Sequence, residues 1–170
     1  MGEPGRRAGL RSPLSFPALA AGKNAPGMRA TADRLLALPV RHNGIELGRP
    51  VDLSIDLVGG RVIGIEVRCR DESLRFLPLG AARLGADEIA VGSALLLLDD
   101  IGFYRLRGTG FRSLRGEPVE YSGRRLGVLR DVAIGEEGGI EALVVEDGRG
   151  LRPVRFHSSI RVARRRLPAA

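Results

Sequence analysis

The sequence has a single cysteine, Cys69, no tryptophan and only two histidines, His42 and His157. One cysteine excludes an intramolecular disulfide, and we therefore expect a reducing, cytoplasmic compartment. Neither histidine has a cysteine or another histidine at the spacing that metal sites use, so we expect no metal and no cofactor. The longest apolar run of note, 94–98, is far too short to cross a bilayer, which predicts the absence of a transmembrane segment.

Catalytic signatures are equally scarce. The stretch 108–110 (GTG) begins a GxG motif, but it lacks the third glycine and the preceding strand of a dinucleotide-binding loop. His157 precedes two serines, yet neighbouring residues on a strand point to opposite faces. Asp52 and Asp131 recur at matching positions, and a turn or backbone hydrogen-bonding role explains that recurrence without a catalytic carboxylate pair. We expect no enzyme activity and no catalytic residue.

Positive charge is concentrated at the two ends of the chain. The net charge is +7, yet residues 28–160 contain equal numbers of basic and acidic residues, so the excess lies in 1–27 and 161–170. Basic tails either contact phosphate and anionic lipid or remain solvated. Residues 1–30 contain four prolines and no periodicity, which predicts a disordered N-terminal extension. A secretion signal is disfavoured because prolines break its apolar stretch, and Met28 is an alternative natural start.

The most regular stretch, 117–145, is typical of three strands joined by two turns. Val119 and Tyr121 alternate with polar neighbours before the Ser-Gly pair at 122–123, which suits a tight turn. Gly127 interrupts the second strand as a bulge does. A Glu-Glu-Gly-Gly turn at 136–139 then leads into an apolar third strand.

The same pattern occurs 79 residues upstream, over 38–67. The matched positions are Pro39, Val40, Gly44, Leu47, Gly48, Asp52, Ile55, Gly59 and Gly60, which fall on Pro118, Val119, Gly123, Leu126, Gly127, Asp131, Ile134, Gly138 and Gly139. The lead-in is duplicated as well, since Leu35 falls on Leu114. Retention of glycines, turn and alternation over about thirty positions indicates an internal duplication.

Further short strands are expected at 74–79, 88–92, 151–156 and 160–163. Five or six strands in so short a repeat predict a small, closed or partly closed barrel. Between the repeats, the Asp-Asp pair at 99–100 suits a helix cap, and Gly108 a helix stop. The fold class is therefore predicted as all-β, with barrels at 31–98 and 113–167 joined by a linker with a short helix at 99–112.

The motif residues of the second repeat resemble the PRC-barrel family. They are Leu114, Gly116, Val119, Gly123, Leu126, Gly127 and Asp131. In the first repeat Gly44, Gly48 and Asp52 match, whereas Ala37 stands where the family has a glycine. The resemblance covers about 31–166. It implies a six-stranded barrel used as a binding module, as in ribosome maturation factors and in the H subunit of photosynthetic reaction centres.

The resemblance implies a non-catalytic binding or adaptor protein with a protein partner. The alternative is a ribosome maturation factor-like protein that binds a ribosomal protein or RNA of the small subunit through arginines. Candidate partner-binding residues are Phe103, Tyr104, Arg124 and Arg125. For the aromatic pair, packing of the two barrels against each other is the simpler reading. Charge is uneven in the second repeat, basic over 101–130 and acidic over 131–147, so that repeat is either polarised or internally paired across strands.

Overall fold

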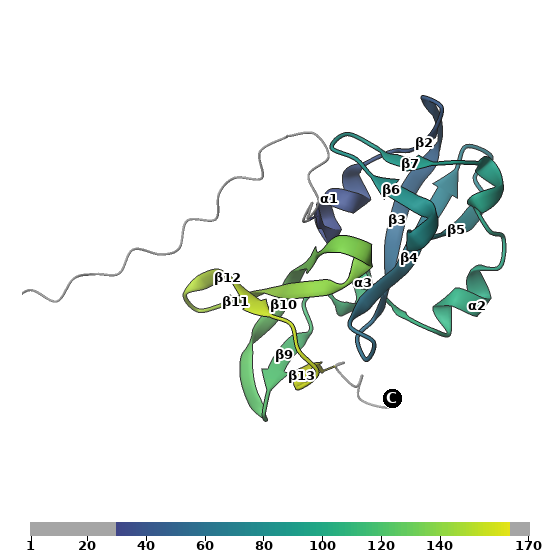
Figure 1. Ribbon diagram of the computed structural model, residues 1–170. Coiled ribbons are helices and arrows are strands. Elements are labelled where there is room, and N and C mark those ends of the chain that lie inside the picture. Colours follow the sequence, from purple (N-terminus) through teal and green to yellow (C-terminus); the bar gives the residue numbers. More distant parts are fainter. Residues whose placement is uncertain (1–29, 164–170) are drawn as a thin grey trace, which may run out of the picture.

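A computed structural model describes residues 30–163 of the 170-residue chain. This part is mostly β-structure, arranged as two sheets (Figure 1). The α-helices are α1 (Ala32–Ala37), α2 (Ile101–Arg105) and α3 (Phe111–Leu114). Helices α1 and α3 lie where the sheets meet, and α2 lies on the outer side of the first sheet (Figure 1). The β-rich class predicted from the sequence is confirmed. The predictions made for residues 1–29 and for the basic tail at 164–170 lie outside the described residues.

The first sheet has the order β5-β4-β3-β2-β7-β6, with β8 (Thr109–Gly110) added on β3. Its strands are β2 (Val40–His42), β3 (Ile45–Asp56), β4 (Arg61–Cys69), β5 (Leu74–Pro78), β6 (Ala82–Leu84) and β7 (Ile89–Val91). A single 3₁₀ turn, η1 (Leu79–Ala81), joins β5 to β6, the two ends of this path. So short a link requires the ends to lie close together, and the sheet therefore curls into a half-barrel.

The second sheet has the order β12-β11-β10-β9-β13, with β1 (Ala30–Thr31) added on β10. Its strands are β9 (Pro118–Tyr121), β10 (Arg124–Ile134), β11 (Ile140–Asp147), β12 (Gly150–Arg155) and β13 (Ile160–Val162). The 3₁₀ turn η3 (Glu136–Gly138) joins β10 to β11. The three-strand meander predicted over 117–145 is therefore confirmed. The last strands of the two sheets differ, because β7 pairs parallel to β2 while β13 pairs antiparallel to β9.

The motif glycines occupy the turns and bulges predicted for them. Gly44 and Gly123 have φ values of 79° and 76°, and each follows a residue that also has positive φ, as a two-residue hairpin turn requires. At Gly127 the register with β9 shifts, and an added Cβ would lie 2.3 Å from the Glu146 carbonyl oxygen. A Cβ added at Gly48 would likewise lie 2.4 Å from the Arg68 carbonyl oxygen. A side chain at either bulge would displace the neighbouring strand.

The duplication extends into the tertiary structure as a reciprocal exchange between a first repeat (30–98) and a second repeat (109–163). Strand β1 of the first repeat pairs with β10 of the second, and β8 of the second repeat pairs with β3 of the first. The paired residues are Ala30 with Ile134, Thr31 with Ala133, Thr109 with Ile55 and Gly110 with Ser54. Every residue of the first exchange lies 79 positions from its counterpart in the second, so the two repeats are related by a pseudo-twofold.

One hydrophobic core connects both repeats. Leu35 on α1 and Leu114 on α3 are at most 1% exposed and belong to the same buried cluster as strand residues of both sheets. The buried motif residue Val119 lies in this cluster, and half-buried Leu126 packs against it. Gly116, with φ 87°, ends the α3 lead-in before β9. The motif residues thus shape turns, bulges and core.

Candidate functional site

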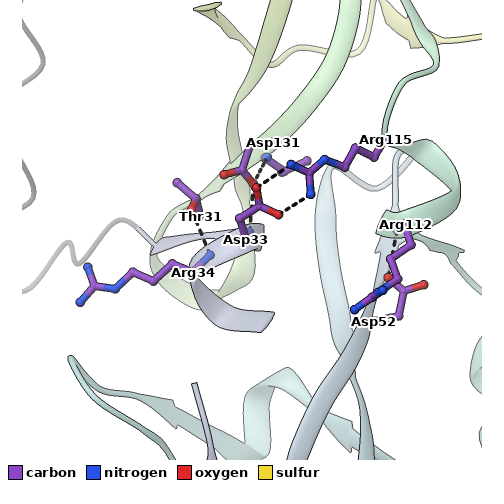
Figure 2. A network of polar contacts seen from close by, with 8 residues as sticks. Thr31, Asp33, Arg34, Asp52, Arg112, Arg115 and Asp131 are labelled. Atoms are coloured by element: carbon purple, nitrogen blue, oxygen red, sulfur yellow. Dashed lines mark hydrogen bonds and ion pairs between the residues drawn. The ribbon is translucent and has the colours of Figure 1, made fainter. Parts of the chain in front are cut away.

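The two recurrent aspartates each cap a helix of the other repeat (Figure 2). Asp131 on β10 accepts hydrogen bonds at Oδ1 from the backbone amides of Asp33 (3.1 Å) and Val132 (2.8 Å). Asp52 on β3 accepts at Oδ1 from the amides of Arg112 (3.0 Å) and Leu53 (2.8 Å). These contacts confirm the backbone hydrogen-bonding role inferred from the sequence.

The environment of Asp131 is more buried than that of an ordinary surface carboxylate. Burial raises the pKa of the Asp131 carboxyl, against the smaller opposing effects of the Val132 and Asp33 amides and the Thr31 side chain. An accompanying cap comes from Thr31, whose Oγ1 accepts from the Arg34 amide at 3.3 Å (Figure 2). The start of α1 is therefore held by one side chain from each repeat.

The GxG stretch serves close approach of β8 to β3. A Cβ at Gly110 would lie 2.3 Å from Asp52 Oδ2, and a Cβ at Gly108 would lie 2.3 Å from the Oγ of buried Ser54. A side chain at position 110 would displace the Asp52 carboxylate, and one at position 108 would press on Ser54 and on the backbone nitrogen of Ile55. The two glycines are accounted for by packing alone.

A cleft of about 510 Å³ lies beside β8. Its lining residues are Asp52, Glu66, Arg105, Gly108, Thr109, Gly110, Ser113 and Glu117. Arg105 donates from Nε and an Nη to the two carboxylate oxygens of Glu66, each at 2.7 Å, and this pairing raises the pKa of Arg105. Sequence reasoning missed this pair, since neither residue stands in a motif and 39 positions separate them.

Helix α2 is fixed to the first sheet and presents side chains outward. Asp100 Oδ1 accepts from the Phe103 amide at 3.1 Å, which confirms the predicted helix cap. Tyr104 stacks on buried Phe76 of β5 with ring centroids 3.8 Å apart, so its contact is with the first sheet. Phe103 is 43% exposed and Leu106 is 89% exposed.

The guanidinium of Arg107 lies 4.1 Å above the Phe103 ring. Residues 103 and 106 are three positions apart along the same helix and its cap, and therefore share a face. We call Phe103, Leu106 and Arg107 the α2 ridge. Of the two aromatic residues proposed from the sequence, Phe103 is available at the surface and Tyr104 anchors the helix.

The turn between β9 and β10 forms a second exposed surface. Arg124 lies opposite Tyr121, and Arg125 lies opposite Glu120, which in turn lies opposite Arg161 on β13. Tyr121 is 43% exposed and contacts the His157 ring edge-on at 5.0 Å. The three arginines make no ion pair within residues 30–163. We call Tyr121, Arg124, Arg125 and Arg161 the basic tip.

Charge in the second repeat is partly paired and partly polarised. In the middle of the sheet Arg130 forms an ion pair with Glu146 on the neighbouring strand. Arg152 likewise pairs with Asp147, at 3.0 Å. Local pairing, one of the two alternatives, thus holds for the centre of the sheet. The basic tip at one end of β10 retains the polarity that the other alternative describes.

The remaining chemically distinctive side chains are scattered. His42 makes a hydrogen bond through Nδ1 with the Val91 carbonyl at 3.0 Å. Cys69 is buried, and that burial raises the pKa of its thiol. Among residues 30–163 no three His, Cys, Asp or Glu side chains are grouped closely enough to hold a metal ion. In the same part of the chain, no helix has the length and apolar character needed to cross a membrane.

No protein-family model matches the sequence, and no curated protein matches it. The PRC-barrel resemblance therefore remains a prediction based on the motif residues.

Proposed function

We propose that the protein is a non-catalytic binding or adaptor module of the PRC-barrel type, and that a protein partner docks on the α2 ridge. The observation that carries this proposal is an exposed aromatic ring and an exposed leucine side by side on a helix that is itself fixed. The recurrent aspartates, which are the strongest catalytic candidates in the sequence, are engaged by backbone amides instead.

The α2 ridge has the composition and rigidity of an interface anchor. Aromatic and arginine side chains dominate binding energy at protein interfaces, above all where they are held in place before binding. Here Arg105 ties the helix to Glu66 by two 2.7 Å hydrogen bonds, and Tyr104 ties it to Phe76. Docking on the ridge would therefore require little ordering of the helix.

The chemistry of the ridge indicates the surface that it fits. Leu106 and the outer edge of Phe103 require an apolar pocket, and Arg107 requires a carboxylate at its rim. A protein surface with an apolar depression bordered by Asp or Glu meets both requirements.

Site-specific photo-crosslinking tests this proposal. A photo-reactive amino acid at position 106 should yield a defined adduct in native cells, and Phe103→Ala in the same chain should abolish it. Val58, which is 98% exposed on a turn, provides the control position for an exposed apolar side chain outside the ridge. Equal adducts from positions 58 and 106, or persistence of the adduct after Phe103→Ala, would contradict docking on the ridge.

The second candidate is a ribosome maturation factor-like protein, and the basic tip is the observation that favours it. Arg124 lies opposite the exposed Tyr121, and this pair suits contact with a phosphate and stacking on a base, while Arg125 points to the other face of the sheet. Under this proposal the protein should co-sediment with the small ribosomal subunit. The Arg124→Ala/Arg125→Ala variant should dissociate from the subunit at a lower salt concentration than the wild type does. An Arg70→Ala/Arg83→Ala variant removes two other exposed arginines and is the control with equal charge. Equal retention of both variants would exclude the tip as the contact.

A further inference from the structure

The segments that begin each repeat occupy equivalent places but have different chemistry. We call 30–36 the first lead-in and 109–115 the second; each consists of a short strand and the start of a helix. Each lies on the central strand of the other repeat. If the repeats were interchangeable, the first lead-in could dock on a second copy of its own repeat, with Thr31 in the place of Gly110.

Sterics oppose such a docking. A Cβ at position 110 would lie 2.3 Å from Asp52 Oδ2, so Thr31 could take that place only if the Asp52 carboxylate left the position in which it accepts from a helix amide. In the converse docking, Gly110 would take the place of Thr31 beside Asp131. The hydrogen bond between the Thr31 hydroxyl and the Asp131 carboxylate would then be lost. Each acceptor strand thus fits the lead-in of the other repeat.

The buried residue that follows differs greatly in volume. Ala32 and Phe111 are equivalent by position, and both are completely buried. Docking the first lead-in on its own repeat would place a methyl group where a phenyl ring fills the core, and the converse would force a ring into the space of a methyl group. Both exchanges are unfavourable, the first through a cavity and the second through overpacking.

Charge distinguishes the pairings in the same direction. Across the pseudo-twofold, Arg115 donates to both oxygens of Asp33, at 2.9 and 3.0 Å (Figure 2). The equivalent positions are Leu36 for Arg115 and Arg112 for Asp33. Two first repeats would leave Asp33 facing Leu36, and two second repeats would set Arg112 against Arg115. Only the unlike pair brings opposite charges together.

We propose that the two lead-ins are keys that dock only on the unlike repeat, so that the chain closes as a pair of different halves and rejects like-with-like association with a second copy. Gly110 and Phe111 form one key, and Thr31, Ala32 and Asp33 form the other. The closed pair presents two different turns, 43–44 and 122–123, at opposite ends of the molecule (Figure 1). This inference does not depend on which surface binds a partner.

Cleavage of the folded chain tests the pairing itself. A specific protease site inserted in the exposed turn after Leu106 allows the full chain to be folded first and cut afterwards. The two fragments should remain associated one to one in native mass spectrometry. After isotopically light and heavy cut samples are mixed, the exchanged complexes should all contain one first and one second fragment. Separation of the fragments, or complexes of two like fragments, would overturn the proposal.

Hydrogen exchange in the uncut chain tests the steric key. Gly110→Thr should make the Arg112 amide exchange about tenfold faster or more, because the added Cβ displaces the Asp52 carboxylate that accepts from this amide. Gly92→Thr is the matched control, since a Cβ at Gly92 meets nothing within 4 Å. Thr31→Gly should leave the Arg112 amide unchanged. A wild-type exchange rate at Arg112 in Gly110→Thr would show that the site accepts a side chain and that the key is absent.

Discussion

Replacement of Asp131 separates the role of its oxygen from that of its charge. Asp131→Ala removes the acceptor of two backbone amides, those of Asp33 at 3.1 Å and Val132 at 2.8 Å. Loss of an N-cap acceptor costs about 0.5–2 kcal/mol, and a buried donor left unpaired costs about 1–3 kcal/mol. Release of a carboxylate from a half-buried site returns part of that cost. We expect Asp131→Ala to lower the free energy of unfolding by about 2–3 kcal/mol.

Asp131→Asn retains an oxygen at the same place and removes the charge, so it should change the free energy of unfolding by less than about 1 kcal/mol. Urea denaturation near neutral pH measures both variants, with hydrogen exchange at Asp33 as a local readout. We expect the wild type and Asp131→Asn to have similar free energies of unfolding, and Asp131→Ala to have a clearly lower one. Equal destabilisation by Asn and Ala would show that the charge, and not the acceptor geometry, holds α1.

The difference in stability between Asp131→Asn and the wild type should depend on pH, and burial of the Asp131 carboxyl determines the sign of that dependence. The pKa of Asp131 is raised in the folded protein above its unfolded value of about 3.9. Its contribution to stability is then fully present below the unfolded pKa and is lost as pH rises through the folded pKa. The unfolding free energy of Asp131→Asn minus that of wild type should therefore increase from about pH 4 towards neutrality. A decrease over that interval would mean that Asp131 gains more from its amide donors than it loses by burial.

Two further pairs of substitutions and one chemical probe test the packing. Gly108→Ala should destabilise the protein by about 1–3 kcal/mol in urea denaturation because its Cβ meets Ser54, whereas Gly80→Ala, which meets nothing within 4 Å, should be nearly neutral. Tyr104→Ala should lower the melting temperature by removing the stack on the first sheet, and Phe103→Ala should leave it almost unchanged. Buried Cys69 should react with thiol reagents in urea but only slowly in native buffer, and rapid native labelling would contradict its burial.

The features that sequence reasoning anticipated are mainly local. Residues only a few positions apart determine these features, and their types indicate their backbone preferences. Examples are the turns at 43–44 and 122–123, the bulge at Gly127 and the helix cap by Asp100. The sequence also indicated the duplication, because glycines and the alternation of apolar residues recur in register. The backbone role of Asp52 and Asp131 followed from that recurrence.

What only the tertiary structure decided is which distant groups meet. The sequence indicated that the Asp131 carboxylate accepts a backbone hydrogen bond. It did not indicate that the donor is the amide of Asp33, 98 positions away in the other repeat. Nor did it indicate the pairing of Arg105 with Glu66, or the parallel placement of β7 beside β2. Such contacts depend on the shapes of two assembled surfaces, and small differences such as Gly110 against Thr31 are decisive only once those surfaces meet.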